Sequence, residues 1–290
     1  MQARADLWLA AILMVAVGAA LLFITHRLSA QARGWHLGAG IGVLASLLLL
    51  FGFVFSDSIL IARLLPLRCL PVCGNLAFPL ALALCGLLLR SPIPPWRRVP
   101  LVALLVGVAT WALVAPLLRD TPACGDWWEG DTCMQTGLVS CSAAAAATLL
   151  RHQGIEATEQ EMAGLCLTSA KGTTTHGLFR GLLIKTAGTR YRPRACILSL
   201  SELQASRELP AITSVVLTGE ISESEPRYAR DWGWQIGVSH AVVILGFPGD
   251  GRVLMADPSA GQEYWRTEGL RDLMTGVCIL LTSRDKAAQE

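Results

Sequence analysis

The pattern of apolar and polar residues changes near residue 119. Before that point four stretches carry no Asp, Glu, Lys, Arg or His, and they cover residues 7–25, 37–56, 69–89 and 99–118. Each is close to the twenty or so residues that a helix needs to cross the hydrocarbon core of a bilayer. The pattern therefore predicts a membrane region over residues 1–118 with four transmembrane helices, followed by a separate domain over residues 119–290.

The third stretch has the weakest pattern, because Pro71, Gly74, Asn75 and Pro79 interrupt it. The first stretch is too long, and too closely followed by a second, to be a cleaved signal peptide. Four crossings would put the N-terminus and the downstream domain on the same side, and loss of the third would reverse the side of the domain. The arginines count five to four for a domain outside the cytoplasm: Arg27, Arg33, Arg90, Arg97 and Arg98 against Arg4, Arg63, Arg68 and Arg119.

The second part of the chain has shorter apolar runs separated by turn residues. An alanine-rich helix is expected over residues 142–152, a helix with a capping box over 158–167, and a third over 178–188. Short runs typical of strands follow at residues 195–198, 211–217, 237–247, 252–256, 263–266 and 277–281. Helices followed by an antiparallel meander predict an α+β domain.

Composition excludes several classes of partner. Hydrophobic residues make up 53% of the chain and charged residues 16%, with a net charge of +2. The chain has no Lys/Arg-rich block with interleaved aromatic residues and no phosphate-binding Gly-rich loop, so we expect neither a nucleic acid nor a nucleotide. The nine cysteines match no zinc spacing, so we expect no metal and no cofactor. A disulfide between Cys124 and Cys133 stays open, because it depends on the compartment.

Cys141 is a candidate nucleophile because it immediately precedes the alanine-rich helix. The positive end of a helix dipole favours the thiolate, which is the reactive form of cysteine. Taken alone, a cysteine in this place is as readily a small buried hydrophobic residue.

His240 is a candidate general base within an apolar run that otherwise suits a buried strand. Asp257 ends the next predicted strand, and Pro248-Gly-Asp-Gly251 between the two strands is a hairpin turn signal. A hairpin would place His240 and Asp257 side by side, so that the carboxylate fixes the tautomer of the imidazole. Each residue also has an ordinary structural explanation, as a satisfied core histidine or as a turn-forming aspartate.

Gln135 lies six residues before Cys141, where its amide could donate to a developing oxyanion together with the backbone N–H of Cys141. Two other histidines fit the role of base less well. His152 lies eleven residues along the same predicted helix, which is about 16 Å at 1.5 Å per residue. His176 lies in a predicted Gly/Thr loop and stays a weaker candidate.

At these residues the chain resembles the bacteriocin-processing cysteine peptidases. These are papain-like bacterial enzymes that remove leader peptides, often after a double glycine. The similarity covers roughly residues 130–285 and lies in Gln135-Thr-Gly-Leu-Val-Ser-Cys141-Ser-Ala-Ala, in Ser239-His-Ala-Val-Val-Ile-Leu-Gly246 and in Asp257-Pro-Ser-Ala-Gly261.

The resemblance implies a papain-like fold and a site in which Cys141 is the nucleophile, His240 the base, Asp257 the orienting carboxylate and Gln135 the oxyanion donor. It also implies a peptide or protein substrate and a bacterial inner-membrane location. Ser142 stands where the family usually has glycine. The best-known members are fused to ATP-driven exporters, and this chain lacks the phosphate loop of an exporter, so the double-glycine specificity does not carry over.

Two other functions remain open from the sequence. One is a catalytically silent peptide-binding or assembly module on a membrane anchor, whose groove would be lined by tryptophans (Trp127, Trp128, Trp232 and Trp234). Such a module would have no thiolate with a depressed pKa. The other is a transpeptidase, which shares the thioester intermediate with a peptidase and cannot be separated from it by sequence.

Overall fold

The structure is a computed structural model that describes residues 4–31, 34–206 and 208–284. Arg33, which contributes to the arginine count above, lies outside these residues. The chain divides into two compact units, one formed by residues 1–61 and 65–119 and the other by residues 62–64 and 120–290. Each unit is described by itself.

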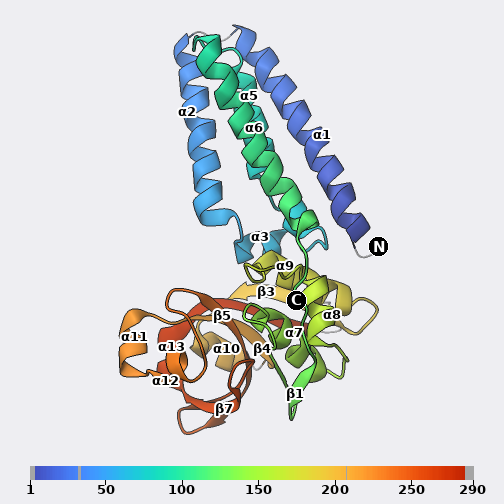
Figure 1. Cartoon of the computed structure of the whole chain (residues 1–290), viewed down its shortest axis with the longest axis vertical. Helices are drawn as coiled ribbons and strands as arrows, with labels where there is room; N and C mark the ends of the chain where they lie inside the picture. The colour runs from blue at the N-terminus through green and yellow to red at the C-terminus, as the bar shows by residue number, and fades with distance from the viewer. Residues whose placement is uncertain (1–3, 32–33, 207, 285–290) are drawn as a thin grey trace. The chain divides into compact units, whose positions relative to one another are not determined.

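The first unit consists of helices (Figure 1). Four helical segments are long and apolar enough to cross a membrane by length and composition: Ala5–Gln31, Gly34–Phe55, Leu70–Leu88 and Pro95–Leu118. The third is broken near Gly74, where the sequence places its interruptions. The elements are α1 (Ala5–Leu28), η2 (Ser29–Gln31), α2 (Gly34–Leu50), the π-helix η3 (Phe51–Phe55), α3 (Ile59–Leu64), α4 (Leu70–Cys73), α5 (Ala77–Leu88) and α6 (Pro95–Leu118).

Helix α5 is the central helix of this unit and contacts α1, α2 and α6. Gly86 lets α1 approach closely, because a Cβ added there would lie 2.0 Å from Oγ1 of Thr25. That hydroxyl also donates to the carbonyl oxygen of Ala83 across 2.9 Å. Small residues and hydroxyls at helix contacts are typical of packing in a membrane. The outer helices instead expose large apolar side chains, such as Phe53 at 86%.

The second unit has its longer helices before the sheet, as the sequence predicts for an α+β domain. A small hairpin, β1 (Trp127–Glu129) and β2 (Thr132–Met134), comes first and was not predicted. Thr158 caps α8 by accepting from the N–H of Glu161, which confirms the predicted capping residue. The helices are α7 (Cys141–Arg151), α8 (Glu159–Leu165), α9 (Thr175–Lys185), and the short α10 (Leu200–Ser206), α11 (Gly219–Ser224), α12 (Arg227–Arg230) and α13 (Thr267–Leu273).

The main sheet has six antiparallel strands in the order β3-β8-β4-β5-β6-β7. The predicted meander holds for β4 to β7 only. The last strand returns to lie between β3 and β4, a long-range pairing that local sequence patterns do not encode, so the simple meander is wrong. The strands are β3 (Tyr191–Ile197), β4 (Ala211–Val216), β5 (Ser239–Gly249), β6 (Arg252–Asp257), β7 (Gly261–Arg266) and β8 (Met274–Ser283).

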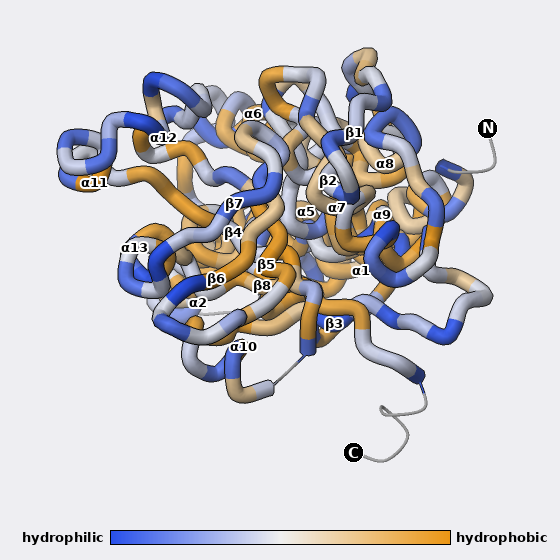
Figure 2. The backbone as a smooth tube through the Cα atoms, turned by 90° about the horizontal axis from the view of Figure 1, so that it is seen from below, coloured by the Kyte–Doolittle hydropathy of each residue, from blue (hydrophilic) through white to orange (hydrophobic). Residues whose placement is uncertain are grey.

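Hydrophobic residues concentrate in the strands at the middle of this sheet, whereas the α11 segment is hydrophilic (Figure 2). Val242 and Ile244 of β5 and Val253 and Met255 of β6 are fully buried. Alternate side chains of a strand face the same side, so these residues fix the register of β5 against β6. That register decides where the polar ends of the two strands meet.

Candidate active site

Cys141 is the first residue of α7, a buried helix that holds the thiol in place. Ala143 to Ala147 have no exposed surface, so α7 runs through the interior and its small side chains allow close packing around it. Ser140 precedes the helix without capping it, and its hydroxyl bonds to Gly137 instead. The first N–H groups of α7 therefore have no side-chain cap, which leaves the positive end of the helix at the thiol.

His240 and Asp257 meet at the polar ends of β5 and β6. Val243 lies opposite Ala256, and continuing this register brings Asp257 level with Val242, two residues from His240 on the same face. Diagonal neighbours on one face are within reach of an aromatic side chain. Nε2 of His240 lies 2.8 Å from Oδ1 of Asp257, whose side chain is fully buried. The predicted hairpin thus brings the two residues together, as diagonal rather than directly opposite neighbours.

The thiol of Cys141 and the imidazole of His240 interact closely enough to shift the pKa of each other, and Nε2 of the ring is engaged by Asp257. Burial by itself raises the pKa of Cys141, but the hydrogen bond and charge of His240, the N–H of Ala241 and the hydroxyl of Ser142 outweigh it, and the pKa is lowered from its usual 9.0. Burial opposes protonation of His240, but Asp257 and Cys141 raise its pKa from 6.5 to about 10. The two shifts together favour a thiolate on Cys141 beside an imidazolium on His240.

Ser142 is one position at which this chain departs from the family that it resembles. Where that family usually has glycine, this chain has a hydroxyl that helps to lower the pKa of Cys141. A hydrogen bond to the charged form of a group favours that form. The substitution is therefore compatible with a reactive thiol.

Ser259 also belongs to this cluster, and the sequence analysis missed it. Its backbone N–H donates to Oδ1 of Asp257 across 2.8 Å, and its Oγ lies 3.1 Å from the same oxygen and 3.2 Å from Nε2 of His240. Its position two residues after an aspartate is the usual signal of an Asx turn, which would have predicted the N–H contact. The contact with the histidine depends on the tertiary fold.

Gln135 follows β2 and lines the same cavity as Cys141 and His240. Its backbone N–H donates to the carbonyl oxygen of Pro258 across 2.8 Å. Its side-chain Nε2 lies 3.4 Å from the carbonyl oxygen of Gly137, which is a long hydrogen bond. The amide is held weakly and stands beside the cysteine.

Glu159 is a second residue that the sequence analysis missed. It is fully buried at the first turn of α8. One carboxylate oxygen accepts from the N–H of Thr136 across 2.9 Å and the other from its hydroxyl across 2.6 Å. Because Thr136 is the neighbour of Gln135, this carboxylate fixes the loop that leads to the cysteine. Its partner lies in another part of the sequence, so no local pattern reveals it.

The four residues that the sequence predicts for the site lie at a cavity of about 460 Å³. Cys141, His240, Gln135 and Ser259 line it directly, and Asp257 lies behind His240. Trp234 covers the histidine, with ring centroids 4.7 Å apart. A cavity of this size with a few convergent polar groups is typical of a binding site for part of a larger ligand.

Other candidates from the sequence lie elsewhere. His176 is not in a loop as predicted but in the first turn of α9, where it is buried because the helix begins at Thr175. It is not among the described residues that line the cavity. His152 caps the far end of α7. Cys124 and Cys133 are free thiols. Within residues 4–31, 34–206 and 208–284, no three His, Cys, Asp or Glu side chains gather in a way that would hold a metal ion.

The thiol lies at a helix N-terminus and interacts with a histidine, which is hydrogen-bonded to a carboxylate. This arrangement is typical of a cysteine-dependent acyl-transfer enzyme. The sequence profile of the Peptidase C39 like family matches residues 127–274, just over half of the chain. The chain therefore belongs to that family of cysteine peptidases, which confirms the expectation drawn from the sequence motifs.

Individual relatives are distant. An uncharacterized protein of Methanothermobacter thermautotrophicus is 37% identical over 71 residues, which are 24% of this chain and 47% of that protein. The chain thus spans about half the length of the curated relative it matches. The solved peptidase domain of Streptococcus ComA, a bi-functional ABC transporter, is 19% identical, with 52% of this chain and 96% of that domain covered and a TM-score of 0.41. A double glycine motif protease from an AMS/PCAT transporter, solved with a leader peptide, is 17% identical, with 57% and 96% covered and a TM-score of 0.40.

Proposed function

We propose that this protein is a membrane-anchored cysteine peptidase that cleaves a peptide or protein through Cys141, His240 and Asp257, with Gln135 as the oxyanion donor. The observation that carries the proposal is the chain of contacts from the thiol to the imidazole to the buried carboxylate, beside one cavity. The lowered pKa of Cys141 argues against a catalytically silent module, for which the pKa of that thiol should not be depressed.

The proposed reaction begins with attack of the Cys141 thiolate on the carbonyl carbon of the scissile peptide bond. The developing oxyanion would accept from the backbone N–H of Cys141 and from the amide of Gln135. The imidazolium of His240 then gives its proton to the leaving amine as the C–N bond breaks, which leaves a thioester on the sulfur. His240 next takes a proton from water as the water oxygen attacks the thioester carbonyl carbon. The C–S bond then breaks, the Cys141 thiolate is regenerated, and the acid product leaves.

The decisive experiment replaces Cys141 with alanine in the full-length protein in native membranes. The variant should lose labelling by a thiol-reactive probe at pH 6 and should retain its substrate, which mass spectrometry can then identify. Cys124→Ala is the matched control, because it removes another partly exposed thiol whose pKa is raised rather than lowered. Equal labelling of wild type and Cys141→Ala at pH 6 would contradict the proposal.

Membership of the peptidase family supports a peptide or protein substrate. A related domain has been solved in complex with a leader peptide. We propose a peptide substrate here as well and carry over no cleavage-site specificity from the exporter-fused members, whose phosphate loop this chain lacks. A substrate trapped by Cys141→Ala would give the cleavage site directly.

The membrane part of the proposal rests on the four apolar helical segments and their arginine distribution. We place the protein in the bacterial inner membrane with the peptidase domain outside the cytoplasm. A membrane-impermeant thiol reagent applied to intact spheroplasts should then label Cys141 and not the Cys141→Ala variant. Labelling only after the membrane is permeabilised would reverse the orientation and leave the peptidase proposal intact.

A further inference from the structure

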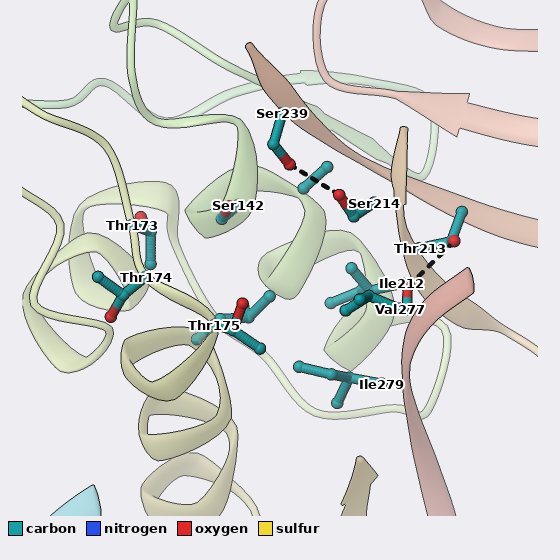
Figure 3. Close-up of a pocket in the computed structure, with 12 residues that line it drawn as sticks. Ser142, Thr173, Thr174, Thr175, Ile212, Thr213, Ser214, Ser239, Val277 and Ile279 are labelled. Atoms are coloured by element: carbon teal, nitrogen blue, oxygen red, sulfur yellow. Dashed lines mark hydrogen bonds between the residues drawn. The ribbon is translucent and has the colours of Figure 1, made fainter. Parts of the chain in front are cut away.

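Figure 3 shows a second, smaller cavity of about 100 Å³. The two share Ser142, Thr173 and Ser239 in their linings. Ser142 follows the nucleophile, and Ser239 precedes the histidine. Because side chains alternate along a strand, Ser239 and Ala241 point to the other side of β5 from His240. The small cavity therefore lies beside the reacting groups and not beneath them.

The lining of this cavity is rich in hydroxyls, and none of the described residues that form it is charged. Seven of its twelve lining residues are serine or threonine, and the others are apolar. Figure 3 shows the threonines of residues 173–175 on one wall and the Ser214–Ser239 pair on another. Ile212, Val277 and Ile279 supply an apolar wall.

The hydroxyls retain hydrogen-bonding capacity toward a ligand. Oγ of Ser214 and Oγ of Ser239 lie 2.7 Å apart, so one donates to the other. The accepting hydroxyl keeps its own O–H as a donor, and each oxygen keeps a lone pair. Threonines at positions 173 and 174 are engaged on their outer sides, by Thr168 and by the N–H of Gly177. The pair on β4 and β5 is thus the part best suited to recognise a polar atom.

We propose that this cavity is a specificity pocket that takes a short, uncharged, hydrogen-bonding side chain of the substrate, such as threonine, serine or asparagine, within two positions of the scissile bond. The inference rests on the proposed peptidase function and adds the substrate class. A glycine at that position would leave the pocket empty.

Size and charge both restrict what the pocket accepts. A protein cavity of about 150 Å³ holds a benzene molecule, so the smaller volume here excludes aromatic side chains. A charged side chain would lose part of its hydration without meeting an opposite charge, because the pocket has no charged side chain among its described lining residues. A short side chain with one polar atom fits both the apolar wall and the hydroxyl pair.

Dipeptidyl acyloxymethyl ketones test this pocket although the natural substrate is unidentified, because they alkylate a catalytic thiol directly. The side chain is varied at each of the two positions before the ketone, and labelling of Cys141 in the full-length protein in detergent is followed by mass spectrometry. At one of the two positions threonine should label about fivefold faster than valine, the effect of one hydrogen bond. Phenylalanine and glutamate there should be roughly 100-fold slower than threonine.

Two variants at one partly exposed position sharpen the test. Ser214→Ala removes a hydroxyl and should reduce the preference for threonine over valine to about one. Ser214→Leu fills the pocket and should slow the threonine probe roughly tenfold more than it slows the glycine probe. Ser201→Ala and Ser201→Leu, on the exposed surface of α10, are the matched controls.

The outcomes separate this inference from the proposed function. If the rate of Cys141 labelling does not depend on the side chain at either position, or is highest for aromatic or charged side chains, the specificity pocket is contradicted. The proposed peptidase function would still stand. Failure of every probe to label Cys141 would overturn both.

Discussion

The backbone N–H of Gln135 donates to the carbonyl oxygen of Pro258 across 2.8 Å. This bond ties the loop before the nucleophile to the turn that carries Asp257 and Ser259. The proposed oxyanion donor and the carboxylate behind the base therefore lie on segments that are joined by a direct hydrogen bond. A substrate carbonyl between them would meet groups whose spacing is set before it binds, which is what electrostatic stabilisation of a transition state requires.

The paired shifts of Cys141 and His240 predict the pH dependence of activity. The ion pair needs a deprotonated thiol and a protonated imidazole, so activity should rise with pH below 9.0 and fall near pH 10. In His240→Ala the thiol loses its main compensating partner, and burial should move its pKa to 9.0 or above. Probe labelling at pH 6 should therefore fall, with recovery at pH 10. If labelling of His240→Ala rises over the same pH range as labelling of the wild type, the proposed pairing of Cys141 with His240 would be contradicted.

Substitution of Gln135 should separate chemistry from thiol reactivity. Gln135→Ala should lower kcat about 100-fold or more, as loss of an oxyanion donor does. Alkylation of Cys141 by iodoacetamide should be unchanged, because that reaction develops no oxyanion. Gln153→Ala, which truncates a glutamine after α7, is a control for the substitution type. An equal loss of both reactivities would show that Gln135 only holds the loop.

Ser259 is predicted to position the histidine through its hydroxyl. Ser259→Ala keeps the backbone N–H bond to Asp257 but loses the contacts of Oγ with His240 and with the carboxylate. We expect kcat/KM to fall roughly tenfold, in line with one hydrogen bond to a charged group. The falling limb of the pH profile should also move to lower pH, and Ser259→Thr should restore it. A lower rate with an unchanged pH profile would point to a purely structural role.

Glu159 is predicted to stabilise the loop between β2 and α7. Glu159→Ala leaves the N–H and the hydroxyl of Thr136 without their buried acceptor, which should lower the free energy of unfolding by about 1–3 kcal/mol. Thermal unfolding of the full-length protein in detergent should show a lower Tm. Glu161→Ala in the same helix removes an exposed carboxylate and is the matched control. Equal Tm values for the two variants would contradict the role.

Local sequence signals predicted most elements of this protein. The uncharged stretches indicated the long helices, the capping box indicated the start of α8, and the turn at residues 248–251 indicated the β5–β6 hairpin. Gln135, Cys141, His240 and Asp257 come from separate segments, and the fold brings them to one place. Their roles stay predictions until the variants are measured.

Features that depend on contacts between residues far apart in the chain could not be predicted from local sequence patterns. The insertion of β8 between β3 and β4 pairs strands that are far apart in the chain. Glu159 reads as an ordinary first-turn acid, and only its contact with Thr136 shows why it is buried. His176 was placed in a loop because glycine and threonines precede it, whereas Thr174 caps a helix that starts at once.

The nucleophile lies at the start of α7, whereas its partner histidine lies on β5, far later in the chain. Ribosomal synthesis therefore delivers Cys141 long before the groups that lower its pKa. Until β5 and β6 have emerged and paired, the cysteine is a chemically ordinary thiol, poorly able to attack neighbouring chains. The pairing of β5 with β6 and the activation of the Cys141 thiol therefore occur together during biogenesis.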